Sequence, residues 1–136
     1  MITDGIITLL KNDATLSALT TQIMPTGAVK LPQPPYIVYH IGTTLDTNTV
    51  QGATGYRLAR FQFDCYSNLY TEAKKIIKAV RGVLQNFKNT TLSDTDATFV
   101  QACLIDFESD MPMVQQGTAG VFFRVMVQVS VWYKES

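Results

Sequence analysis

The chain has 136 residues and no net formal charge, and 46% of its residues are hydrophobic while only 16% are charged. The lack of net charge argues against strong nonspecific attraction to nucleic acid or to an anionic membrane. Soluble domains usually carry about 25% charged residues, so we infer that other subunits cover part of this surface. The length suits a single domain over residues 1–136 whose core needs no metal or disulfide.

The N-terminal segment is predicted to be helical. Thr3 or Asp4 can cap a short helix with Ile6 and Leu10 facing inward, and Asp13 can cap a further helical segment. The start of the chain lacks the basic region of a signal peptide, and no segment approaches the ~20 apolar residues of a membrane span. We therefore expect a soluble protein made in a reducing cytosol.

Proline and threonine mark the next part of the chain. Four of the five prolines lie in residues 25–35, which predicts an irregular connector. Alternating apolar side chains then predict a first strand over residues 36–41. Residues 42–55 are rich in threonine, glycine and asparagine, and we predict a long hairpin loop there, of the kind that often carries function.

A strand then runs into a long helix with almost no linker. Residues 57–67 alternate between apolar and polar side chains, which predicts a strand with one buried face. Residues 69–87 place apolar side chains on one stripe at steps of three and four, which predicts an amphipathic helix. A helix of this length can carry the chain back across a sheet, which would make the strands before and after it parallel.

Two further strands complete the predicted fold, over residues 99–107 and 121–134, with a second long loop over residues 108–120 at the opposite end of the sheet. The last strand would reach ~46 Å when extended, which exceeds the ~37 Å diameter of a compact domain of this size. It must therefore bend, carry a bulge or overhang its own domain. The predicted class is α+β: a four-stranded mixed sheet in α-β-β-α-β-β order, with one long central helix and a short N-terminal helical segment packed on it.

The residues that carry chemistry form no pattern for catalysis, a cofactor or a metal. His40 is the only histidine, and it lies opposite the core face of its strand, in a structural or surface position. Asp106, Glu108 and Asp110 can offer carboxylates to a cation, but hard cations usually gather more ligands, and we interpret them as a solvated loop entrance. We expect no catalytic residue, no cofactor and no metal.

Cysteines and lysines allow two interpretations each. Cys65 and Cys103 lie on inward strand faces, and we interpret them as buried free thiols, with a disulfide as the alternative. The central helix has a basic face, which we interpret as the wet side of an amphipathic helix, with contact to an acidic partner or to passing DNA as the alternative. This basic face consists of Lys74, Lys75, Lys78, Arg81 and Lys88.

Polar side chains on the outward strand faces and in the two loops are the candidate contacts of an assembly. An arginine opposite a core face can form ion pairs between subunits, although an ordinary surface ladder explains it equally well. The two predicted loops are the candidates for contacts along the assembly axis. The candidate residues are Arg60, Gln62, Asp64, Arg124 and Gln128 on strands, Thr47, Asn48 and Gln51 in the first loop, and Met111, Met113 and Gln115 in the second.

Several segments, in their order and spacing, resemble the tail-completion, or tail-terminator, family of long-tailed bacteriophages. The resemblance covers nearly the whole chain. It rests on Leu9-Leu10, Ile23-Met24-Pro25, Pro34 to Tyr39, Phe61 to Tyr66 with the following helix through Ala73 and Val80, and Val131-Trp132-Tyr133. It implies a small α+β protein that assembles as a ring, commonly a hexamer.

The resemblance also implies a structural virion protein and no enzyme. Its ring would cap the head-proximal end of the tail tube, stop tube polymerisation and provide the surface for head–tail joining, with DNA passing through. The implied partners are other copies of the chain, the tail-tube protein and head-completion or neck proteins, but no membrane and no sequence-specific nucleic acid. Assembly would take place in the host cytoplasm.

Two alternatives stay open. Among virion proteins, the chain can be a head–tail connector or the tail-tube subunit itself, and a tube subunit would form long tubes where a terminator stops at rings. From another class, a ferredoxin-like nucleic-acid or ligand-binding module would be monomeric or dimeric, and nucleic-acid binding would depend strongly on salt.

Overall fold

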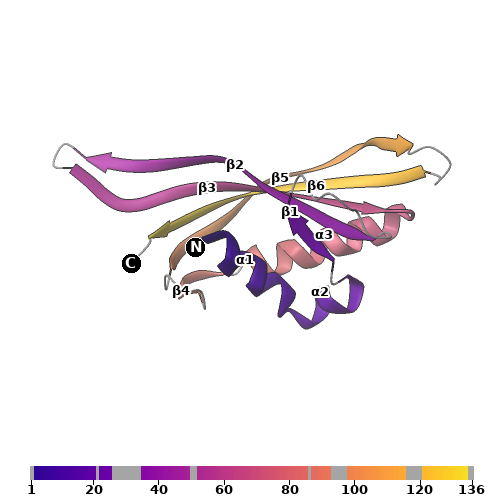
Figure 1. The fold of residues 1–136 in the computed structure, drawn as a ribbon, viewed down its shortest axis with the longest axis horizontal. Coiled ribbons are helices and arrows are strands. Elements are labelled where there is room, and N and C mark those ends of the chain that lie inside the picture. Colours follow the sequence, from indigo (N-terminus) through magenta and orange to yellow (C-terminus); the bar gives the residue numbers. More distant parts are fainter. Residues whose placement is uncertain are drawn as a thin grey trace.

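The computed structural model describes residues 2–20, 22–25, 35–49, 52–85, 87–92, 98–115 and 121–134. The helices are α1 (Ile2–Lys11), α2 (Ala14–Leu19) and α3 (Tyr70–Gln85), and the strands are β1 (Ile23–Pro25), β2 (Tyr36–Thr49), β3 (Gly52–Ser67), β4 (Lys88–Thr91), β5 (Phe99–Gln115) and β6 (Val121–Lys134). The strands of the described residues form one six-stranded sheet in the order β1-β2-β3-β6-β5-β4. The three helices lie on one face of this sheet (Figure 1).

The centre of the sheet is the antiparallel pair β3–β6, whose register runs without a shift from Tyr56 opposite Lys134 to Ser67 opposite Phe123. Alternate side chains of both strands therefore face the helices. Eight of these side chains are fully buried: Ala59, Phe61, Phe63, Cys65, Val125, Val127, Val129 and Val131. They pack in one core with the buried stripe of α3, which confirms the predicted buried face of β3 and that of the helix from Ala73 to Leu84. The predicted ends of the helix are wrong, because Leu69 precedes α3 and is 60% exposed, and Phe87 follows α3.

The two N-terminal helices extend the same core. α1 buries Ile6 and Leu10 completely. Asp13 caps α2 as predicted, because its carboxylate accepts the N–H of Leu16 at 2.9 Å. A Cβ atom at Gly5 would lie 2.7 Å from the side chain of Leu92, so this glycine lets α1 approach the segment that follows β4.

The predicted fold class, a four-stranded sheet with one long central helix, is wrong. The described residues are mostly strand, with six strands and three short helices, of which α3 has 16 residues. β1 pairs in parallel with β2, and β4 pairs antiparallel with β5. These strands contain three and four residues, too few for an alternating pattern to indicate them in the sequence.

Both predicted long loops are also wrong, because most of their residues lengthen the strands, while residues 50, 51 and 116–120 lie outside the described part of the chain. β2 continues to Thr49 and β3 begins at Gly52, and β5 continues to Gln115. Threonine is β-branched and suits a strand, and in residues 42–49 and 52–55 this preference prevails over the turn-forming glycines and asparagines. The result is two projecting arms, the β2–β3 arm (residues 42–49 and 52–57) and the β5–β6 arm (residues 104–115 and 121–126).

The two arms project from opposite ends of the sheet (Figure 1). Residues 42–49 and 108–115, which belong to the two predicted loops, thus lie at opposite ends of the sheet, as predicted. β3 and β5 are each antiparallel to β6 and hence parallel to each other, as predicted for the strands before and after the long helix. β6 lies between them.

The buried aromatic residues of β3 should dominate stability. Replacing Phe63, which is fully buried, by alanine should lower the free energy of unfolding by about 3–5 kcal/mol, because the lost transfer energy adds to the cost of a cavity. Leu69→Ala is the matched control, since Leu69 is 60% exposed and its loss should change stability by less than about 0.5 kcal/mol. Urea unfolding followed by circular dichroism measures both, and equal effects would contradict this core assignment.

Candidate functional site

Five of the predicted contact residues lie together on the face of the sheet opposite the helices, the helix-free face. Along β3 and β6 they alternate with the buried residues, so their side chains lie on the opposite face. Gln62 lies directly across from Gln128. Arg124 and Arg60 lie at the two ends of this cluster, and Asp64 lies within it. The structure therefore brings together the strand residues that the sequence singled out.

An ion pair within the chain anchors this cluster. A terminal nitrogen of Arg124 lies 3.0 Å from Oδ2 of Asp64, whose side chain is 6% exposed. The amide of Gln62 donates to the same carboxylate at 3.2 Å. The Arg124 guanidinium lies 5.7 Å from the ring centre of Tyr66, which stacks on Tyr36. Arg124 and Asp64 thus pair with each other inside one subunit.

The acidic residues of β5 are divided between the two faces of the sheet. A register shift beside Asp106 is a β-bulge, which changes the face that the following residues occupy. Asp106 accepts the hydroxyl of Ser130 at 2.6 Å on the helix-free face. Glu108 and Asp110 lie on the helix side, 3.3 and 3.0 Å from Nζ of Lys74. The predicted loop entrance is therefore wrong, because these carboxylates belong to a strand, and Asp106 lies on the other face of the sheet from Glu108 and Asp110.

The predicted basic face of the helix is also divided. Lys74 and Arg81 lie 3.0 to 3.6 Å from carboxylates of β5. Lys75 and Lys78 are exposed, and Lys88 begins β4 instead of lying in the helix. The five side chains therefore do not form one continuous basic surface.

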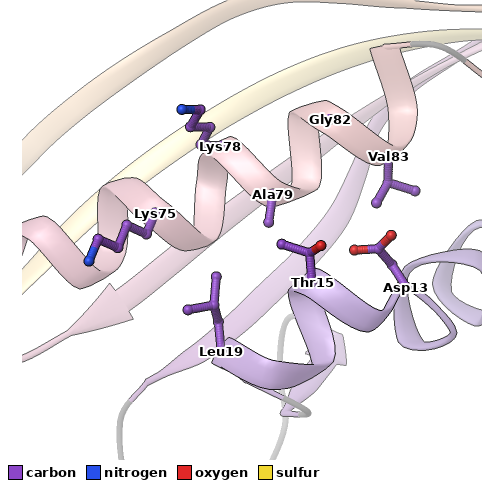
Figure 2. A pocket seen from close by; sticks show the side chains of 8 residues that line it. All are labelled: Asp13, Thr15, Leu19, Lys75, Lys78, Ala79, Gly82 and Val83. Atoms are coloured by element: carbon purple, nitrogen blue, oxygen red, sulfur yellow. The ribbon is translucent and has the colours of Figure 1, made fainter.

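A groove of about 550 Å³ lies between α2 and α3. Leu19 and Ala79 contribute apolar surface from the two helices, and Lys75 and Lys78 line the same groove (Figure 2). Asp13 also lines the groove, but its carboxylate accepts the N–H of Leu16 as the N-cap of α2. In the part of the chain that the structure describes, no three His, Cys, Asp or Glu side chains are grouped to hold a metal ion. None of the described helices is long and apolar enough to cross a membrane.

The other predicted contact residues belong to the two arms. The backbone places Asn48 opposite Ala53 near the end of one arm, and Met111 opposite Arg124 in the other. Met111 therefore adjoins the helix-free cluster. Five of the predicted loop residues lie on strands: Thr47 and Asn48 on β2, and Met111, Met113 and Gln115 on β5. Gln51 lies outside the described residues.

Three exposed apolar side chains on the helix-free face were not predicted. Leu45, Leu104 and Phe107 are 48%, 53% and 45% exposed. Leu45 falls in a segment that was expected to be a loop. The bulge at Asp106 moves Phe107 to the face opposite Ile105, whereas simple alternation assigns both to the core. The sequence signal that could have identified Leu45 as a contact residue is its apolar side chain within a threonine-rich segment.

Both cysteines are free and buried, which confirms the interpretation as free thiols. Burial raises the pKa of the Cys65 thiol to about 12, with a smaller contribution from the charge of Glu72. Burial raises the pKa of Cys103 to about 12 as well. Neither thiol is therefore poised as a nucleophile at neutral pH.

The described residues thus form a sheet with two projecting arms, whose helix-free face carries a polar cluster and three exposed apolar side chains. The family model described as "Tail completion protein gp17" matches residues 4–134. The chain belongs to this family of bacteriophage tail proteins, which confirms the resemblance noted in the sequence and the expected location in the virion.

The comparison with solved structures supports the same fold. A chain from the "Virion of native gene transfer agent (GTA) particle" superposes with a TM-score of 0.66 at 15% sequence identity. The match covers 94% of this chain and 91% of the other. A search of curated proteins found no match.

The Arg124–Asp64 pair should matter for stability. Arg124→Met leaves the buried Asp64 carboxylate with the Gln62 amide as its remaining, weaker partner. We expect the free energy of unfolding to fall by roughly 2 kcal/mol, less than the roughly 3–5 kcal/mol for breaking a fully buried pair, because Arg124 is partly exposed. Adding Asp64→Asn removes the unpaired charge, so the double variant should lose less than the sum of the single losses by at least about 0.5 kcal/mol. Urea unfolding of the four proteins measures this coupling, and strictly additive losses would contradict it.

The cysteines should be inert in the folded protein. Both pKa values are raised to about 12, so at pH 8 almost no thiolate is present, and reactivity should rise only as the pH approaches those values or the chain unfolds. Iodoacetamide at pH 8 should leave the native chain unmodified and add two groups after urea denaturation. Mass spectrometry counts these groups. Modification of the native chain within minutes would contradict the described burial.

Proposed function

We propose that this chain caps the head-proximal end of the phage tail tube as an oligomeric ring, hexameric in our proposal. The ring ends tube polymerisation and provides the surface for head–tail joining. In this proposal residues 1–136 act as one tail-terminator domain. Membership of the tail completion family supports the role in the tail, and the ring and its capping action are what we add.

The observation that carries this proposal is the pair of arms at opposite ends of the sheet (Figure 1). A terminator needs one face that fits the last ring of the tube and another face that does not accept further tube subunits. Arms at opposite ends supply two such faces. Their sequences also differ, since Thr47, Asn48 and Gln51 are polar whereas Met111 and Met113 are apolar.

The partners that we propose are those that the family resemblance implies, and the two arms are our candidates for contacting them. One face of the ring contacts the tail-tube protein and the other contacts head-completion or neck proteins, with assembly in the host cytoplasm. The ring leaves a passage for DNA, and a chain with no net charge would not hold DNA strongly as it passes. The mechanism is steric complementarity, and we assign no enzymatic step to the chain.

The β2–β3 arm can be shortened to test this function. Replacing residues 47–56 by Asn-Gly joins Asp46 to Arg57, its register partner, through a two-residue turn that favours a hairpin. We expect this variant to fold, because the buried residues of β2 and β3 from Leu58 onward are retained. Wild-type chain at one ring per tube should halt growth of purified tube protein, and the shortened variant should not. Electron microscopy of tube lengths provides the measurement.

A matched control changes the turn alone. Replacing Val50 and Gln51 by Asn-Gly keeps the length of the arm, since Thr49 and Gly52 pair on either side, and this variant should stop tube growth as the wild type does. Wild-type chain that leaves tube growth unchanged would overturn the capping role. Chain that polymerises into long tubes by itself would instead support a tube subunit.

A further inference from the structure

We propose that the ring closes by strand pairing, in which the free edge of β2 in one copy pairs antiparallel with the free edge of β5 in the next copy. The subunit sheets then join into one continuous sheet around the ring. This inference rests on the proposed ring and adds the contact that builds it.

Both edges are open along most of their length. β1 covers β2 only from Ile37 to Tyr39, and β4 covers β5 only from Phe99 to Ala102. Among the described residues, no strand pairs with the outer edge of β2 over 41–49 or of β5 over 103–115. Long open edges present unpaired backbone N–H and C=O groups to other chains, and monomeric proteins generally protect them.

The two open edges lie on opposite sides of the sheet, which favours a ring. Pairing unlike edges is a heterologous contact that passes from copy to copy and closes when the rotation fits, whereas pairing like edges would give a two-fold dimer. β2 runs antiparallel to β5, because three antiparallel pairings separate them. The arms are also staggered along the strands (Figure 1), and closing a sheet into a barrel requires such a stagger.

The exposed apolar side chains lie on these same two strands. Leu45 is on β2, and Leu104 and Phe107 are on β5. Their register partners place all three on the helix-free face: Leu58 across from Leu45, Ser130 across from Leu104 and Gln128 across from Phe107. Pairing the two edges would bring Leu45 of one copy beside the apolar residues of the next and cover them, as cross-strand apolar pairs do.

Proline limits the length of the pairing segment. Pro112 lacks a backbone N–H and lies where the register of β5 shifts, between Met111 and Val114. Glu108 and Asp110, which precede it, are held by Lys74 of α3, so their charges do not oppose a neighbour. We therefore place the contact on residues 103–110 of β5.

Paired cysteines test this contact. Thr44 lies on the helix side, since its register partner Ala59 is buried there, and Leu45 lies on the helix-free face. Each is replaced by cysteine in turn and combined with a second cysteine at each of residues 107–110. With Thr44→Cys, disulfides between copies should form at Glu108 or Asp110 and be at least fivefold weaker at the other two positions. With Leu45→Cys this alternation should reverse, because facing side chains of paired strands share one face.

Non-reducing gels after mild oxidation measure these disulfides, and the wild-type chain is the matched control because its two cysteines are buried. Crosslinks without alternation, or only between like arms, would overturn the strand pairing. Light scattering on the same samples separates this inference from the proposed function. Rings that form without the predicted crosslinks would overturn the pairing alone. A chain that stays monomeric at high concentration, with and without tube protein, would overturn both.

Discussion

The uninterrupted antiparallel pairing of β3 with β6 is the constraint on which the rest of this structure depends. Twelve consecutive register pairs run from Tyr56 opposite Lys134 to Ser67 opposite Phe123. Because no bulge interrupts them, every second side chain of both strands faces the helices, and α3 packs its buried stripe on this surface. The same pairing sets the polar residues of the helix-free face side by side, so that Arg124 reaches Asp64.

The outer strands tolerate irregularity that the central pair does not. β2 shifts register against β3 at two places, and β5 shifts against β6 at three. Bulges bend a strand and increase its twist. One of them divides the acidic residues of β5 between the two faces and turns Phe107 away from the core. The chain thus combines a regular centre, which supplies stability, with irregular arms, which in our account supply the contacts.

Long, regular patterns in the sequence were sufficient to predict the centre of the fold. Alternation identified β3 and β6, and spacing at three and four identified α3. Asp13 was recognisable as a helix cap from its residue type and position. Strand residues such as Arg124 and Asp64 were correctly placed on one face, because both lie in strands without bulges in their mutual pairing.

The short edge strands, the arms, the bulge and the helix–strand ion pairs could not be predicted from the sequence, for physical reasons. β1 and β4 form because a neighbouring strand pairs with them, and their few residues carry no period of their own. The arms looked like loops because threonine, glycine and asparagine have opposing preferences, and tertiary pairing decides between them. A count of alternating residues cannot reveal the bulge that turns Phe107 to the helix-free face. The ion pairs of Lys74 and Arg81 cross from helix to strand, so spacing along the helix does not reveal them.

Cryo-electron microscopy of isolated tails tests the central claim most directly. The account predicts a closed ring of copies of this chain on the last ring of the tube at the head-proximal end, with one arm of each copy directed toward the tube and the other toward the head. Copies distributed along the tube, or a single copy without rotational symmetry at that end, would contradict it.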